Sequence, residues 1–365
     1  MQVPTFRYLR WFKERAPHAR ISLAQSGMGV PPESILPLHS LSWRLDVDDM
    51  DGYAPLQERI ATHLGVSADR VAVLPGCTCA THLAARALID EGDAVAVESP
   101  TYELLVRLAE MSGAQVRRLP RPPERSFQLS MELVEKTFMQ GSSLLLLTVP
   151  HNPSGRMLGD LEVAELAALA ENHDARILAD EVYLDFFPRK LRSYPSLAAV
   201  SERFITTGSL TKTHGLANLR VGWAAGPPEV ASAIRRLNEY YSDRIPAFDA
   251  QAAVLAFDRM EELLQRAHRV RETNWPILSA WAEGLQGVEV LDPGAGITAV
   301  LRIPEAIDSL ALAEGILERD GVLVCPAEMF GSHGFLRISY GIDKPDLQEG
   351  LGAVKDALAR AGQRV

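Results

Sequence analysis

Three short segments of the chain each place polar side chains directly after an apolar run of the kind that forms a strand. They are His151–Gly155, Ala179–Tyr183 and Ser209–Arg220. Together they supply an amide, a carboxylate, a phenol, an amine and a guanidinium. A lysine amine that forms a Schiff base, with an aspartate for the pyridinium nitrogen, is the protein's part of pyridoxal-phosphate chemistry. The three segments, in this order, therefore predict a site for pyridoxal 5′-phosphate.

Lys212 and Asp180 carry most of this prediction. A nucleophilic lysine must lose its proton near neutral pH, and desolvation or neighbouring cations lower its pKa for that purpose. A solvated surface lysine is the alternative. Asp180 ends an apolar run, where a carboxylate needs a partner such as a pyridinium nitrogen, a helix cap or an arginine. Tyr183, three residues further on, can reach the same ring.

The other contacts to the cofactor are assigned by residue type. Asn152 has an amide that can donate to the ring oxygen, although an Asx turn ahead of a proline would also use it. A phosphate needs backbone N–H groups at a helix start together with a hydroxyl. The segment Gly76–Cys77–Thr78 offers both ahead of a helical stretch. Ser209 adds a second hydroxyl, and Arg220 adds a fixed positive charge with a planar fork that suits oxyanions.

Two further candidates lie outside these segments. Tyr102 follows Ser99–Thr101 and is placed to stack on the ring, with a core tyrosine as the alternative. Arg337 lies in an apolar, strand-like run near the C-terminus, where a buried arginine needs an anion. The α-carboxylate of a substrate would satisfy it in a bidentate manner. A structural salt bridge is the alternative.

Metal binding is not predicted. Cys77, Cys79 and His82 are close in sequence, but positions two apart on a helix do not face the same way. Cys325 is isolated, so no second pair of ligands completes a zinc-type site.

The elements that must position these residues follow the pattern of a parallel α/β sheet, because short apolar runs alternate with helix-period stretches. The expected strands are 94–97, 144–149, 176–179 and 203–207, and the expected helices are 81–88, 104–111, 161–172 and 196–202. Ligands bind beyond the carboxyl ends of the strands in such sheets. Each candidate residue of the middle region lies just past such an end, so the residues are expected to form one site.

The C-terminal third is expected to form a smaller domain. Long helices are expected at 229–241 and 248–271, and the second is expected to bridge to the smaller domain. The smaller domain would hold strands at 288–291, 298–303 and 335–340 and a helix at 309–320. We therefore expect an N-terminal arm with part of the small domain at 1–40, a large cofactor-binding domain at 41–270 and a small domain at 271–365.

Composition narrows the functional class. A chain of 365 residues exceeds what one core usually supports, so two domains are expected. The net charge of −10 argues against nucleic acid or an anionic membrane as the main partner. No apolar run approaches the ~20 residues of a membrane helix. Residues 1–13 read as an amphipathic arm rather than a secretory signal. Three cysteines, an odd number, indicate reduced thiols and a cytoplasmic setting.

These residues resemble the class I/II pyridoxal-phosphate aminotransferases of fold-type I, the aspartate aminotransferase superfamily. The family motifs Asn-Pro-x-Gly, Asp-x-x-Tyr and Ser-x-x-Lys…Arg match at Asn152, Asp180 and Ser209 and in this order. The resemblance extends from about Ser26 to Gly341. It implies an α/β fold, with a large domain built on a mostly parallel central sheet flanked by helices and a smaller α+β domain.

The resemblance also implies a role for each candidate. Lys212 would be the Schiff-base lysine that shuttles the proton, Asp180 would pair with the pyridine nitrogen, and Arg337 would bind the α-carboxylate. The ring oxygen would be held by Asn152 and Tyr183. Lys212, Asp180 and Tyr183 would be the catalytic residues, and Asn152 would also contact the substrate. The phosphate and ring contacts would come from Gly76, Cys77, Thr78, Tyr102, Ser209 and Arg220. Cys77 departs from the small residue, often Gly or Ala, that is common at its position.

A shared active site follows from the same resemblance. Tyr53, in the segment Gly52–Leu56, matches the tyrosine that crosses a dimer interface to the neighbour's phosphate, which implies a homodimer. Gly27 matches the glycine of the N-terminal segment that lies against the substrate. Residues 326–331 read Pro-Ala-Glu-Met-Phe-Gly, where the family usually has Pro-Gly before Phe-Gly, so the local turn is expected to differ.

The expected activity is transfer of an amino group from an amino acid to a 2-oxo acid. The same cofactor and lysine also serve lyases, decarboxylases and cyclising enzymes, and these core residues do not separate them. Arg244 would favour an acidic substrate if it pointed into the pocket, and a surface position is the alternative. A transcription regulator with an aminotransferase-like domain is disfavoured, because neither length nor charge leaves room for a DNA-binding domain.

Overall fold

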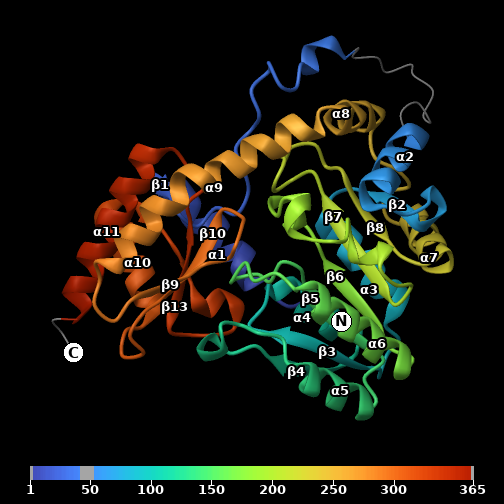
Figure 1. Cartoon of the computed structure of the whole chain (residues 1–365), viewed down its shortest axis with the longest axis horizontal. Helices are drawn as coiled ribbons and strands as arrows, with labels where there is room; N and C mark the ends of the chain where they lie inside the picture. Colours follow the sequence, from blue (N-terminus) through green and yellow to red (C-terminus); the bar gives the residue numbers. More distant parts are fainter. Residues whose placement is uncertain (1–2, 42–52, 363–365) are drawn as a thin grey trace.

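A seven-stranded sheet forms the centre of the larger part of the molecule in the computed structural model, which describes residues 3–41 and 53–362 (Figure 1). Its strand order is β2-β8-β7-β6-β5-β3-β4. The strand β8 runs antiparallel to both of its neighbours, β2 and β7, and the other pairs in this sheet are parallel. In chain order the strands are β2 (Val71–Leu74), β3 (Ala94–Ser99), β4 (Gln115–Pro120), β5 (Leu144–Thr148), β6 (Arg176–Asp180), β7 (Phe204–Ser209) and β8 (Gly222–Ala225).

The central strands β5, β6 and β7 are almost entirely buried because helices cover both faces of the sheet. Every residue of β5 is buried, and since side chains alternate across a strand, Leu144 and Leu146 join one core while Leu145 and Leu147 join another. The first core includes α3 (Cys77–Leu88), α4 (Glu103–Met111) and α7 (Pro228–Glu239). The opposite face carries α5 (Met131–Met139), α6 (Asp160–Asn172), α2 (Tyr53–Leu64) and α8 (Ala247–Asp258).

A four-stranded antiparallel sheet forms the smaller part, in the order β12-β13-β10-β9. Its elements are β9 (Glu289–Leu291), β10 (Thr298–Arg302), α10 (Ser309–Asp320), β12 (Cys325–Pro326), β13 (Phe335–Ser339) and α11 (Lys344–Gly362). The N-terminal segment joins this part, because β1 (Ile21–Ser22) pairs in parallel with β11 (Val322–Leu323). A short helix, α1 (Arg7–Arg15), precedes it.

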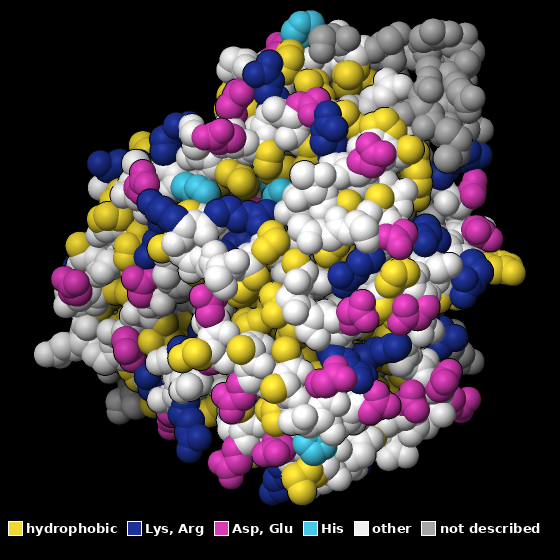
Figure 2. Space-filling view, turned by 45° about the vertical axis from the view of Figure 1, so that its right-hand side comes forward, with side chains coloured by type: hydrophobic (Ala, Val, Ile, Leu, Met, Phe, Trp, Pro, Cys, Tyr) yellow, Lys and Arg dark blue, Asp and Glu magenta, His cyan; other side chains and the backbone are white. Residues whose placement is uncertain are grey.

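Helix α9 (Met260–Glu283) connects the two parts, as Figure 1 shows. Leu263 near its start packs in the core of the large sheet, and Leu278 near its end packs in the core of the small sheet. None of the helices in the described ranges is long and apolar enough to cross a membrane. Figure 2 shows basic and acidic side chains interspersed over one face of the molecule, without a large field of a single sign.

Two expectations from the sequence are wrong. Residues 196–202 form no α-helix but only a 3₁₀ turn at Leu197–Ala199, because this segment is a short connection whose apolar side chains anchor it in the core. The helix expected at 248–271 is two helices, α8 and α9, separated at Arg259, which leaves helical geometry with ψ of 18°. The four expected strands of the large sheet and the three of the small one are present.

Candidate active site

A cavity of about 470 Å³ opens beyond the carboxyl ends of β5, β6 and β7. It brings together nine of the predicted residues: Cys77, Thr78, Tyr102, Asn152, Asp180, Tyr183, Ser209, Lys212 and Arg220. The convergence follows from topology, because parallel strands deliver their carboxyl ends to one edge of the sheet. Adjacent elements add Ser26, Thr148 and four residues of the N-terminal segment.

Lys212 lies on the loop that follows β7, with its amine directed into the cavity wall. Its Nζ donates a hydrogen bond to the hydroxyl of Ser26 at 2.8 Å. Gly27 packs against it so closely that an added Cβ would lie 3.3 Å from the Lys212 Cα, and the amide of Met28 donates to the Lys212 carbonyl. Burial lowers the pKa of the Lys212 amine, and the nearby Arg337 charge acts in the same direction. The amine is therefore closer to its nucleophilic, neutral form than an exposed lysine.

Asp180 is the last residue of β6 and is buried. One of its oxygens, Oδ1, accepts hydrogen bonds from the backbone amide of Val182 at 3.0 Å and from the thiol of Cys77 at 3.4 Å. Burial raises the pKa of this carboxyl. A carboxylate in such surroundings gains from a cationic partner, and a protonated pyridine nitrogen fits this requirement.

The start of α3 forms an anion-binding corner. Gly76 precedes the helix with φ of 84°, no side chain caps the helix, and the first turn points its N–H groups outward. An added Cβ on Gly76 would collide with the guanidinium of Arg220, so glycine allows the arginine to approach the helix start. Thr78 and Ser209 contribute hydroxyls beside it. This combination suits a phosphate group.

Arg337 lies behind the cavity wall, on the central β13, and is not among the residues that line the cavity. Its Nη1 donates to Asn152 Oδ1 at 3.1 Å, and its Nη2 donates to the Tyr8 hydroxyl at 3.0 Å. Its Nη2 also donates to the Ala24 carbonyl at 3.0 Å, and its Nε is buried without a hydrogen-bond partner among the described residues. None of these acceptors is a carboxylate. A buried guanidinium that lacks a carboxylate suits an incoming anion.

The N-terminal helix α1 supplies residues that the sequence did not reveal. Phe6, Tyr8, Leu9 and Lys13 line the cavity. Tyr8 packs edge-on against Tyr102 with ring centroids 5.7 Å apart. The aromatic residues near the N-terminus were visible in the sequence, but no spacing connects them with residues a hundred positions away.

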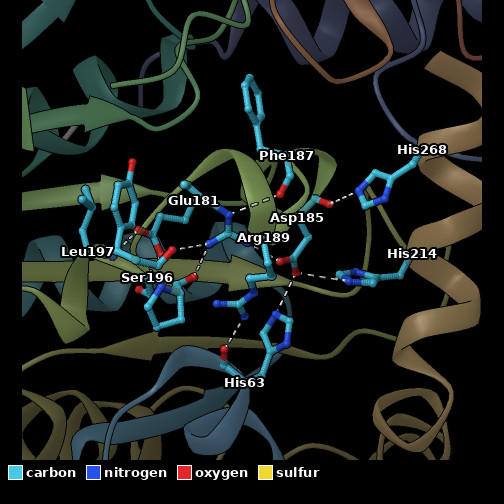
Figure 3. A network of polar contacts seen from close by, with 12 residues as sticks. His63, Glu181, Asp185, Phe187, Arg189, Ser196, Leu197, His214 and His268 are labelled. Carbon is cyan, nitrogen blue, oxygen red and sulfur yellow. Dashed lines mark hydrogen bonds and ion pairs between the residues drawn. The ribbon is translucent and has the colours of Figure 1, made fainter. Parts of the chain in front are cut away.

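A buried polar network supports the loop that carries Lys212 (Figure 3). Asp185 accepts a hydrogen bond from His63 Nε2 at 2.8 Å and from Arg192 Nη2 at 3.2 Å, and its carboxylate lies 3.3 Å from His214 Nε2. His214 is two residues beyond Lys212, so the network fixes this loop against α2. Burial alone would raise the pKa of Asp185, but His63 and His214 hold it well below its usual range.

Glu181 forms a second branch of this buried region (Figure 3). It accepts hydrogen bonds from the Ser196 hydroxyl at 2.6 Å and from the Leu197 amide at 2.8 Å. Burial nevertheless raises the pKa of its carboxyl to about 7. His151 is also structural, since its ring nitrogens contact Ser154 Oγ and the Pro100 carbonyl.

Tyr53 and Arg244 lie away from the cavity of this chain. Tyr53 begins α2, half-buried, and its phenol is hydrogen-bonded to the backbone of Val73. Gly52, the start of its segment, is outside the described residues. Arg244 forms an ion pair with Asp243 at 3.2 Å and does not line the cavity.

Comparison with known proteins matches this geometry to one family. The family description "Aminotransferase class I and II" matches residues 39–354. Capreomycidine synthase of Streptomyces vinaceus is 31% identical over 78% of this chain and 73% of its own length. The arginine–pyruvate transaminase of Pseudomonas aeruginosa is 30% identical over 82% of this chain and 79% of its own.

A solved structure shows the same fold. The pyridoxal-phosphate-dependent aminotransferase of Streptococcus suis superposes with a TM-score of 0.91 at 25% identity, over 99% of both chains. The cavity described above therefore lies in a framework that is similar over its whole length to a known structure.

Proposed function

The chain belongs to the class I and II aminotransferases, an enzyme family dependent on pyridoxal 5′-phosphate, and from this premise we propose that it transfers an amino group from an amino acid to a 2-oxo acid. One observation carries the proposal. The half-buried Lys212, the buried Asp180 and the guanidinium-bearing Arg220 all line one cavity.

Each group has a defined part in this reaction. When bound, the cofactor supplies an aldehyde that condenses with amines and a ring that draws electrons from the substrate Cα. Lys212 attaches the cofactor and later carries the proton away from Cα. Asp180 keeps the ring nitrogen protonated, and Asn152 and Tyr183 hold the ring oxygen. The phosphate contacts are Gly76, Cys77, Thr78, Ser209 and Arg220, with Tyr102 stacked on the ring.

The substrate is held separately from the cofactor. Arg337 binds the α-carboxylate together with Asn152, whose Oδ1 it already contacts, and Gly27 leaves room beside Lys212. Fixing the carboxylate orients the bond to be broken at Cα, which is the positioning contribution to the rate.

A second candidate function is a cyclising or other replacement reaction on the same scaffold. The observation that favours it is the 31% identity to capreomycidine synthase, a level close to the 30% found for a transaminase. The residues around Lys212 serve both chemistries, so product analysis has to separate them.

We also propose a homodimer in the cytoplasm. Thr78 and Arg220 line the cavity and are exposed. Tyr53 is half-buried and does not line the cavity of its own chain. Tyr240 and Tyr241 are exposed as well, at 88% and 60%. A second subunit would cover these groups and bring its own Tyr53 to the phosphate.

The three cysteines are free thiols, which suits a reducing compartment such as the cytoplasm.

The test is the visible spectrum of the purified, cofactor-loaded protein mixed with single amino acids and no 2-oxo acid. Transamination predicts that the yellow band is lost and that one equivalent of 2-oxo acid appears per site. Lys212→Ala should fail to complete this change. Continuous release of ammonia, carbon dioxide or a cyclic amino acid would instead support the second candidate.

A further inference from the structure

The first residue of α3, Cys77, contacts the buried carboxylate of the site. Its thiol lies 3.4 Å from Asp180 Oδ1, and both side chains are buried and line the cavity. The contact joins elements far apart in sequence, since Asp180 ends β6 and Cys77 follows the glycine turn at Gly76.

The direction of this hydrogen bond follows from the neighbouring groups. Thr207 Oγ1 lies 3.6 Å from the thiol, and Thr81 Oγ1 lies 3.8 Å from it. Thr81 donates its own proton to the Cys77 carbonyl at 2.9 Å. The carboxylate of Asp180 is the anionic acceptor within reach, so the single thiol proton is directed to it. Burial and the charge of Asp180 raise the pKa of the thiol well above its usual range, which keeps the donor protonated.

The two oxygens of Asp180 are thereby made different. Oδ1 receives both hydrogen bonds, from Val182 and Cys77. Oδ2 makes no hydrogen bond in the described part of the chain. It is also not one of the fully buried side-chain atoms that lack a partner, so part of its surface is exposed. It is therefore the oxygen that remains accessible from the cavity. The neighbouring strand fixes this arrangement, because Thr207 on β7 is in register with Asp180 on β6.

We propose that Cys77 is a positioning residue for Asp180, whose thiol holds Oδ1 so that Oδ2 is presented to the protonated ring nitrogen of the cofactor. The inference rests on the proposed function. A hydrogen bond to the ionised carboxylate favours the charged form, and so offsets the burial that raises the pKa of Asp180.

The contact can be observed without any cofactor through the infrared S–H stretch of the cofactor-free protein. A thiol that donates to a carboxylate absorbs at lower frequency than a free one. We expect Cys77→Ala to remove the lowest S–H band and Asp180→Asn to shift it upward. Cys79→Ala is the matched control, since Cys79 lies two residues along the same helix and has no hydrogen bond to Asp180 among the described contacts; it should leave that band in place.

Cofactor affinity provides the second readout. Titrating the cofactor-free proteins with pyridoxal 5′-phosphate should show binding weakened roughly threefold to tenfold in Cys77→Ala, because the lost bond is charge-assisted but its donor is weak. Cys77→Ser retains a donor and should recover part of this loss, while Cys79→Ala should bind as the wild type does. Circular dichroism and thermal melting confirm that each variant is folded, and the response of the S–H band to Asp180→Asn carries the test if Cys77→Ala does not fold.

Two results would overturn the proposal. One is an S–H band of Cys77 that does not respond to Asp180→Asn. The other is wild-type cofactor affinity in folded Cys77→Ala. Failure of the proposed function looks different: the loaded wild-type protein would form no 2-oxo acid from any amino acid, while the S–H band and the cofactor titration would still report on the contact between Cys77 and Asp180.

Discussion

Burial drives the chemistry of individual residues in this site. It lowers the pKa of Lys212 and raises the pKa of Asp180, so that each group is moved toward its neutral form. The types of these residues, and the strand ends that carry them, could be read from the sequence. The supporting contacts could not. Ser26 and Tyr8 meet Lys212 and Arg337 only through the fold.

Glu181, the neighbour of Asp180, gives a prediction about pH. Its pKa is raised from 4.5 to about 7 in the folded protein. Between those values the folded protein holds a proton at Glu181 that the unfolded chain has lost, so stability falls as pH rises through this window. Glu181→Gln removes this loss. We expect the variant to gain about 3 kcal/mol relative to the wild type on going from about pH 5 to about pH 8.

Urea denaturation of both proteins at the two pH values measures this difference. Asp174→Asn is the control, because Asp174 is an exposed carboxylate with a 91% accessible side chain. Parallel pH dependence in wild type and Glu181→Gln would show that Glu181 is not the group responsible.

At the scale of elements, the sequence predicted β3, β5, β6 and β7 of the large sheet and missed β2, β4 and β8. The strands β5, β6 and β7 are apolar runs with polar ends. By contrast, β4 contains two arginines and exposed ends, and β8 is short and rich in small residues. Their strand character comes from pairing with neighbours rather than from composition. The sequence predicted an α-helix around the 3₁₀ turn at Leu197–Ala199, because Leu197 and Ala198 are apolar residues that pack in the core.

The turn that precedes α3 gives a second prediction. Gly76→Ala should weaken binding of pyridoxal 5′-phosphate by about tenfold or more, because the new Cβ collides with the guanidinium of Arg220 and displaces it from the helix start. Gly92→Ala is a matched control: Gly92 also has positive φ, at 92°, but an added Cβ there meets nothing within 4 Å. Equal affinity losses in the two variants, measured by titration, would argue against the role of Arg220.

The network around Asp185 gives a third prediction. Asp185→Asn leaves the buried Arg192 without its anionic partner, and such a loss costs roughly 3 kcal/mol or more. Urea unfolding measures the change. Asp174→Asn again serves for comparison, because its exposed ion pair with Arg203 should contribute less than about 1 kcal/mol. If both variants lose the same small amount, the network does not stabilise the Lys212 loop.

At the scale of the whole molecule, the sequence predicted two sheets joined by a long helix, and α9 connects their cores. The domain limits at residues 40 and 270 stay a proposal. What the sequence could not provide is the position of α1, which lies over the cavity through contacts to both parts: the Tyr8 amide donates to Glu103, and the Trp11 indole donates to Glu314. Such long-range contacts have no local signal.

The proposed dimer predicts complementation between two inactive variants. Lys212→Ala and Tyr53→Ala should each be impaired alone, since one lacks the amine and the other lacks the partner's phosphate contact. In a hybrid dimer one of the two sites keeps both wild-type residues. Unfolding and refolding the variants as an equal mixture should therefore restore about a quarter of wild-type activity. No recovery in mixed dimers confirmed by size-exclusion chromatography would place Tyr53 in its own site or in none.

The central claim is that Lys212 is the residue that attaches the cofactor. The most direct measurement is borohydride reduction of the loaded protein, followed by proteolysis and mass spectrometry of the lysine-containing peptides. We expect the pyridoxyl group on Lys212. Attachment at Lys13, Lys136, Lys190, Lys344 or Lys355, or at no lysine, would contradict the account.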